Sequence, residues 1–197
     1  MSLETVRLEH LPDSHAVHLA LFRDVQNAAF LHQQLLDRNA DFEYGFIDAS
    51  VIVSRRQLLS AVFKAVLAVI NGSLKTPNVH SEMVCSLSAS NNIADAYRRF
   101  GISPATKHLI VVKVTFPTAS CPHPPSANSI WTHLSANVQG HAVSATDENI
   151  GSATDPAKVR KYYKLNGLSF LDSIKTDDEK RAEMELLILS SMALRGL

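Results

Sequence analysis

The sequence NVHSEMVCSLSASNNIADAYRRFGI, residues 78–102, predicts a strand, a polar turn and a short helix, in that order. Apolar and polar side chains alternate through residues 79–87, which is typical of a half-buried strand. The alternation places Cys85 on the apolar face of this strand and His80 and Glu82 together on the other face. Cys85 is therefore expected to be a reduced thiol in the core of an intracellular protein.

A short basic helix is predicted after this strand. Ser88 or Ser90 is expected to cap its amino end, because a hydroxyl can accept a hydrogen bond from a free amide of the first turn. Apolar residues recur at helical spacing from Ile93 to Phe100, and Gly101 is expected to end the helix in the left-handed conformation. The outward face of the helix is expected to carry Asn92, Asp95, Arg98 and Arg99.

The rest of the chain predicts strands and helices that interleave. Strands are expected over residues 17–22, 42–47, 109–116 and 140–144. Helices are expected after Asp24, from Ser54 to Asn71-Gly72, over residues 130–138, after Asp155-Pro156, and after the capping box of Thr176 and Glu179. Interleaved elements favour an α/β chain with one sheet covered by helices. The pattern leaves parallel and antiparallel pairing open.

The composition is that of a folded chain without net charge. Of its 197 residues 46% are hydrophobic and 19% are charged, which predicts one domain over residues 1–197. Four prolines between positions 117 and 125 predict a surface loop over residues 117–129. The charges of nineteen acidic and nineteen basic residues cancel, which argues against a protein that binds nucleic acid over its whole surface. A local basic patch remains compatible with this balance. No run approaches the ~20 apolar residues that span a bilayer.

Motifs for catalysis or cofactor binding are missing from the sequence. It contains no Gly-rich phosphate loop and no nucleophile elbow, and its nine histidines are scattered. His80 and Glu82 would suit a metal ion or a base, but a solvated strand face explains them more simply. No metal and no cofactor is therefore expected. A small hydrolase or transferase built from dispersed histidines and carboxylates stays an alternative, because distant residues can meet in space.

Two features of the sequence suit binding better than catalysis. The first is a set of basic residues near polar turns, which would form one patch if the two predicted helices lay side by side. Lysine and arginine would then contact phosphates, and exposed Asn91 or Asn92 would reach base edges or sugars. The basic residues are Arg55, Arg56, Lys64, Lys75, Arg98 and Arg99.

The second feature is an apolar carboxyl end. Its apolar residues cannot all face one core from a single helix. They are Leu186, Leu187, Ile188, Leu189, Met192, Leu194 and Leu197. A well-buried terminal helix is one interpretation. The other is a partner-binding surface, for which the candidates are Leu189, Met192, Leu194 and Leu197.

Three segments carry a resemblance to a known family. They are residues 15–66, residues 78–102 with Ser-Asn-Asn-Ile at 90–93 and Arg-Arg-Phe-Gly-Ile at 98–102, and VRKYYKL at 159–165. They are similar to the PRPK-binding protein (TPRKB) family, a small subunit of the KEOPS complex, also called EKC. Ala89 and Ser90 depart from the turn that is common in the family, and residues 117–135 match it poorly.

The resemblance implies both a fold and a role. The fold would be a mixed α+β domain with a largely antiparallel sheet flanked by helices. The role would be that of a non-catalytic subunit, which binds the atypical kinase/ATPase of the complex directly and its other subunits indirectly. It would also bind tRNA, including the acceptor end, in support of N6-threonylcarbamoyladenosine formation. The resemblance further implies a fungal source, telomere and transcription roles, and a place in nucleus and cytoplasm. A stand-alone RNA-binding domain remains a further alternative.

Overall fold

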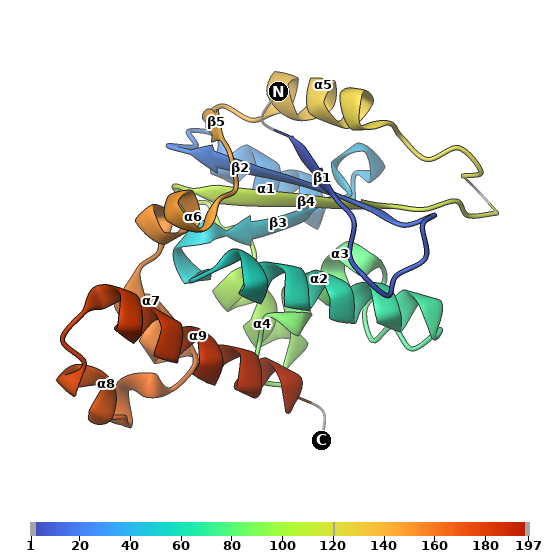
Figure 1. Cartoon of the computed structure of the whole chain (residues 1–197). Helices are drawn as coiled ribbons and strands as arrows, with labels where there is room; N and C mark the ends of the chain where they lie inside the picture. Colours follow the sequence, from blue (N-terminus) through green and yellow to red (C-terminus); the bar gives the residue numbers. More distant parts are fainter. Residues whose placement is uncertain (1–2, 120, 196–197) are drawn as a thin grey trace.

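A computed structural model describes residues 3–119 and 121–195 of the chain (Figure 1). Within these residues one sheet holds β1 (Glu4–Val6), β2 (Ala16–Arg23), β3 (Gly45–Asp48), β4 (Leu109–Thr115) and β5 (His141–Val143). The strand order is β1-β2-β4-β3, and β5 pairs with β2 beyond the end of β1. Every one of these pairings is antiparallel. The expected mixed α/β fold with a largely antiparallel sheet is confirmed.

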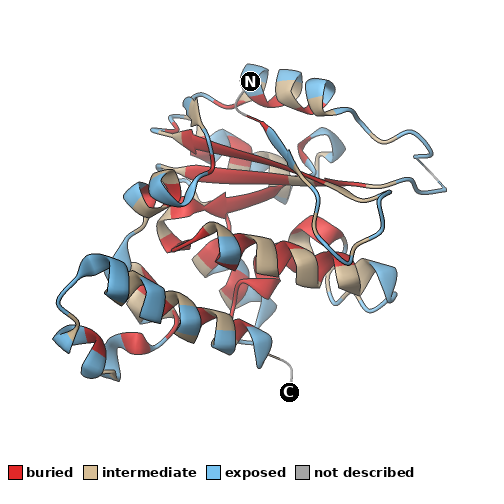
Figure 2. Cartoon of the chain, viewed as in Figure 1, coloured by how far each residue is buried: buried red, intermediate tan, exposed pale blue. Residues whose placement is uncertain are grey.

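Helices cover both faces of the sheet. On one face α1 (Ala28–Leu36) and α5 (Ala127–Asn137) place Leu31 and Leu134 against Phe22 of β2. On the other face lie α2 (Arg55–Ile70) and α3 (Val79–Ser86), and Leu58 of α2 packs with Leu19 of β2. Figure 2 shows the resulting buried layer in the central strands. Because both faces are covered, β2 and β4 read as nearly continuous apolar runs.

The expected helix caps form where the sequence places them. Ser54 Oγ accepts a hydrogen bond from the Gln57 amide at 3.0 Å, and α2 ends at Asn71 before Gly72, whose φ is +61°. Asp155 caps α7 (Pro156–Tyr162). Thr176 and Glu179 cap α9 (Asp177–Ala193) reciprocally. The remaining helices are α4 (Ile93–Phe100), α6 (Asp147–Ala153) and α8 (Phe170–Ser173), with short 3-10 turns η1 (Ala40–Phe42), η2 (Ala49–Val51) and η3 (Leu165–Gly167).

The predicted strand over residues 79–87 is wrong, because α3 occupies this segment. Asn78 starts the helix, since its Oδ1 accepts from the Ser81 amide at 2.8 Å. Seven of the eight residues of α3 are buried. A helix that is apolar or buried all round carries no amphipathic period, so a chance alternation of side chains passes for a strand. His80 and Glu82 consequently lie in the interior, 4% and 6% exposed, and not on a solvated face.

The predictions for the two ends of α4 are also corrected. Asn92, not Ser88 or Ser90, caps α4 by accepting from the Asp95 amide at 3.0 Å. Gly101 is extended, with φ −74°, because the chain continues directly into a bridge with Ile47 that covers the free edge of β3.

Two helix starts differ from the prediction. Asp24 caps nothing, since α1 begins only after Asn27. The predicted loop over residues 117–129 is shorter at its far end, where Ser126 caps α5 through the Ser129 amide at 3.2 Å.

The carboxyl-terminal helices form a further layer next to α2. Figure 1 shows α7, α8 and α9 on the side of α2 that faces away from the sheet, and α9 contacts α2 along its length. Of the described helices, none is both long and apolar enough to cross a membrane.

Candidate functional site

The outward face of α9 exposes apolar residues beside the polar residues Glu183 and Ser190. Met184, Ile188 and Met192 point into the core. The opposite side carries what we call the α9 outer stripe: Ala182, Leu186, Leu189 and Ala193, with Leu194 beside it in the last turn. Leu186 is 60% and Leu194 is 63% exposed, and Figure 2 shows exposed residues along this side of the helix. Contiguous exposed apolar side chains mark protein-binding surfaces.

The structure separates the predicted partner-binding residues. Leu189 is half-buried on the α9 outer stripe, and Leu194 is exposed next to it. Met192 is only 4% exposed, so its assignment to the surface is wrong. Leu197 lies outside the described residues. Leu186 belongs to the stripe although the sequence prediction left it out; its i, i+3 spacing to Leu189 is the signal that would have found it.

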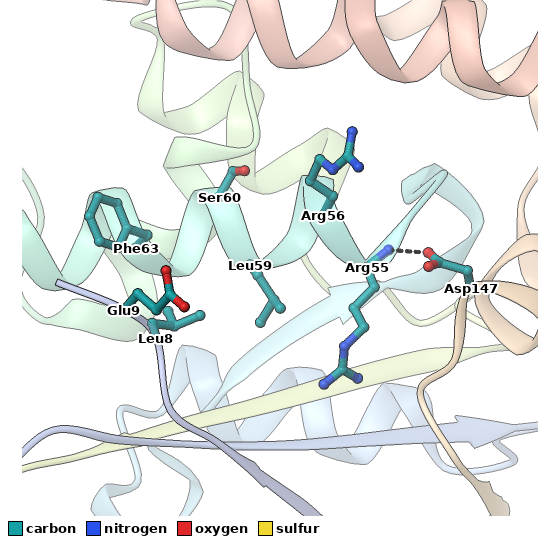
Figure 3. Close-up of a pocket in the computed structure, with 8 residues that line it drawn as sticks. All are labelled: Leu8, Glu9, Arg55, Arg56, Leu59, Ser60, Phe63 and Asp147. Atoms are coloured by element: carbon teal, nitrogen blue, oxygen red, sulfur yellow. Dashed lines mark hydrogen bonds between the residues drawn. The ribbon is translucent and has the colours of Figure 1, made fainter. Parts of the chain in front are cut away.

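The predicted basic residues do not form one patch, because α3 packs against both α2 and α4. Arg55 and Arg56 line a groove of about 510 Å³ with Leu8, Leu59 and Phe63 (Figure 3). The Arg55 guanidinium donates to both carboxylate oxygens of Glu4, at 2.8 and 2.6 Å. Figure 3 also shows the backbone amide of Arg55, which donates a hydrogen bond to the Asp147 carboxylate. The donors of Arg55 are thus used in contacts within the protein. Arg56 instead has a side chain that is 74% exposed, and its guanidinium lies 3.5 Å from the Glu185 carboxylate.

A second hollow, which we call the cationic cavity, lies at the other end of α2. Lys64, Lys75, Asn91 and Arg195 line this space of about 220 Å³. Lys64 Nζ donates to the carbonyl oxygens of Met192 at 3.0 Å and Arg195 at 3.3 Å. Burial lowers the pKa of Lys64, and the charges of Arg195 and Lys75 add to this effect. The sequence prediction missed Arg195, whose contribution depends on where α9 ends.

Glu82 is the one acidic residue among the described residues that line the cationic cavity. Its Oε2 accepts hydrogen bonds from the Lys75 amide and from Thr76 Oγ1, both at 2.9 Å. The carboxylate therefore holds the loop before α3 in place. The side chains of Lys75 and Asn91 keep their polar ends for a ligand, because both residues are exposed.

The arginines of α4 lie at a junction with α7. Arg99 bonds Asp95 at 2.8 Å and donates to the Tyr162 carbonyl at 3.2 Å, with its guanidinium 5.3 Å from the centre of the Tyr162 ring. Arg98 also pairs with Asp95 but has a side chain 73% exposed. Asn92 caps the helix, so its side-chain oxygen is not available to a base. Exposed Lys161 and Lys164 flank Tyr162 and complete a basic α4–α7 junction.

Titratable groups in the interior are paired for structural roles. The Val114 amide donates to Nε2 of His80 at 3.1 Å, so Nδ1 of this ring carries the proton and donates to Glu43 at 3.2 Å. His80 thus accepts a hydrogen bond from β4 beyond the end of its pairing with β3, while β2 pairs with the other side of β4. In the described part of the chain, no group of three or more His, Cys, Asp or Glu could hold a metal ion. Burial raises the pKa of the Cys85 thiol to about 11, which suits an inert core residue.

The His80 bridge predicts how stability depends on pH. Burial lowers the pKa of His80 from 6.5, although the bond to Glu43 opposes the shift. Below about pH 6.5 the unfolded chain binds the extra proton, so the free energy of unfolding falls as the pH is lowered. One proton contributes at most about 1.4 kcal/mol per pH unit.

His80→Gln is expected to reduce this slope, and urea unfolding between pH 5 and 7.5 measures it. Some slope persists in the variant, because burial lowers the pKa of His18 as well. An unchanged slope in His80→Gln would refute the assignment of the proton to this bridge.

Comparisons with known proteins place these surfaces in context. The family model described as kinase binding protein CGI-121 matches residues 22–196. The chain is 66% identical over 197 residues to the EKC/KEOPS complex subunit CGI121 of Gibberella zeae, with 100% of both chains covered. It is 49% identical over 207 residues to the corresponding subunit of Neurospora crassa, again over all of both chains. Identity to the Schizosaccharomyces pombe subunit is 29% over 180 residues, which cover 91% of this chain and 93% of the other.

Proposed function

This chain belongs to the family of the kinase binding protein CGI-121, and we propose that it is a non-catalytic EKC/KEOPS subunit that binds the atypical kinase of that complex directly. The observation that carries the proposal is the α9 outer stripe. Leu186 of the stripe and Leu194 beside it are exposed in the isolated chain, and covering each of them stabilises a complex by up to roughly 1.5–3 kcal/mol. A stand-alone RNA-binding domain would need no such apolar face.

Coexpression with the atypical kinase tests this proposal. The two proteins are expected to elute together in size-exclusion chromatography at micromolar concentration and to bind with a measurable heat in calorimetry. The affinity should be nearly insensitive to salt, since apolar contacts are not screened. Separate elution of two folded proteins would reject a direct contact.

We further propose that the chain contacts tRNA and thereby supports N6-threonylcarbamoyladenosine formation. Several of the exposed cations support this proposal: Arg56, Lys75, Arg98, Lys161 and Lys164. These cations lie at separate places on the protein surface. This arrangement suits an RNA strand or stem that runs along the surface better than one tight contact at a single point. From the family resemblance we also propose that the chain acts in nucleus and cytoplasm and has telomere and transcription roles.

Arg98→Glu combined with Lys161→Glu is expected to weaken tRNA binding about tenfold and to reduce the salt slope of log K by about 2. Both side chains are exposed, so the fold should survive. Arg99 is not included, because its side chain is only 26% exposed and Arg99→Glu would lose the bond to the Tyr162 carbonyl.

The matched control is Arg38→Glu combined with Lys107→Glu. It makes the same change in net charge, in the loop after α1 and in the loop before β4. Filter binding at several salt concentrations measures both variants. Equal losses in the two variants would mean that net charge alone, and not the α4–α7 junction, governs binding.

A further inference from the structure

The last turn of α9 is held in place by two cations. Lys64 of α2 donates to the carbonyl oxygens of Met192 and Arg195, which are free at a helix carboxyl end. Arg195 reaches back and donates to the Cys85 carbonyl oxygen at the end of α3. These three hydrogen bonds join the ends of α3 and α9 to Lys64 of α2 at one place. The end of α9 therefore depends on charged groups that also line the cationic cavity.

The charges around this cavity are not balanced from within. Lys64, Lys75 and Arg195 face the same space of about 220 Å³, and the carboxylate of Glu82, which also binds the loop before α3, offsets only one of these three charges. Burial is the main reason why the pKa of Lys64 is lowered; the charges of Arg195 and Lys75 add to the shift, and the charge of Glu82 opposes it. An anion in the cavity would relieve the repulsion. The cavity holds the volume of roughly seven water molecules, which is enough for a phosphate group.

An anion would not have to break the contacts that hold α9. The lysine ammonium has three donors, of which Lys64 uses two for the α9 carbonyls. The guanidinium has five, of which Arg195 uses one for Cys85. The unused donors, together with those of Lys75 and the Asn91 amide, can bind an anion while the α9 carbonyls remain bonded. Occupancy therefore adds partners to both cations and stabilises the closed turn.

We infer that the cationic cavity is a phosphate-binding site whose occupant clamps the carboxyl-terminal turn of α9. Ala193 of that turn belongs to the α9 outer stripe and Leu194 lies beside it, so the same occupant strengthens binding of a partner on the stripe. By reciprocity, the partner strengthens binding of the phosphate by the same factor. Two identifications rest on the proposed function: that the phosphate belongs to an RNA strand, and that the partner is the kinase. The clamp itself does not rest on it.

Hydrogen exchange tests the clamp on the chain alone. The probes are inorganic phosphate and a four-nucleotide single-stranded RNA, each at a concentration that saturates binding. Both are expected to slow exchange of the amides of residues 190–195 at least threefold, with little change in α1. Binding of phosphate with unchanged exchange at the end of α9 would overturn the clamp. Failure of both probes to bind would overturn the site. RNA that binds but does not compete with phosphate would overturn the assignment of the phosphate to RNA.

Two variants identify the groups that bind the probe. Lys75→Met removes a cavity charge from an exposed loop residue that makes no bond to α9, and Arg195→Met removes the charge that α9 supplies. Each is expected to weaken binding of the phosphate probe at least fivefold. The control Lys107→Met removes an exposed charge elsewhere and should change nothing. Equal weakening in all three variants would overturn the site.

The coupling is tested with the kinase. Saturating RNA is expected to tighten kinase binding at least fivefold for the unmodified chain, within the usual range for coupled sites. For Lys75→Met the tightening should vanish, while kinase affinity without RNA stays normal. Normal kinase binding without any effect of RNA on the unmodified chain would overturn the coupling. Absence of kinase binding in every condition would instead reject the proposed function, so the two failures are distinct.

Discussion

Met192→Asp is expected to lower the free energy of unfolding by roughly 3–5 kcal/mol. Met192 is 4% exposed and shares the inward face of α9 with Met184 and Ile188. Aspartate at this position would bury a carboxylate that has no partner and would remove the apolar contact with the core. Because domains are stable by only about 5–15 kcal/mol, a large part of the total would be lost. Urea unfolding followed by circular dichroism measures the change.

Met192→Leu is the matched control for this variant. It nearly conserves volume and apolarity, so it should cost less than about 1.5 kcal/mol. Loss of kinase binding in Met192→Asp would follow from unfolding and would say nothing about the interface. A cooperative melt of Met192→Asp close to that of the unmodified chain would show that the last turn of α9 is not part of the core.

Leu186→Asp combined with Leu194→Asp is expected to weaken kinase binding at least tenfold and to leave the melt unchanged. The two leucines are 60% and 63% exposed, so aspartate at either position remains in water in the isolated chain. In the complex the carboxylates would be desolvated, and the apolar contact would be lost. A tenfold loss needs only about 1.4 kcal/mol, less than the burial of one leucine contributes. Calorimetry with the purified kinase measures the affinity.

Leu36→Asp provides the control, because Leu36 of α1 is 62% exposed and lies with α1 on the opposite face of the sheet. It should leave kinase binding unchanged. Comparable losses in the α1 and α9 variants, or full binding of the α9 double variant, would reject the α9 outer stripe as the interface. Together with Met192→Asp, the three sets of variants separate the core side of α9 from its binding side.

Local chemistry in the sequence determined much of the fold. Ser54, Asp155-Pro156 and the pair Thr176 and Glu179 predict helix starts correctly, because a capping hydrogen bond involves residues only two or three positions apart. The central strands are predicted over residues 17–22 and 109–116, close to β2 and β4, because short apolar runs need no distant partner to be recognised. The sequence also carried the family resemblance, since segments such as residues 90–102 are distinctive by themselves.

Tertiary structure alone decided that residues 79–86 form a helix, that the side chain of Met192 points into the core, and which cations lie together. The helix α3 is buried on nearly all sides, so its side chains show no period until neighbours are present. Met192 faces inward because α9 packs on α2, which a single apolar stretch cannot reveal. Arg195 joins Lys64 and Lys75 around one cavity only because helix ends that are distant in the chain meet there. Burial and charge proximity are properties of packing between elements, and no pattern within one element contains them.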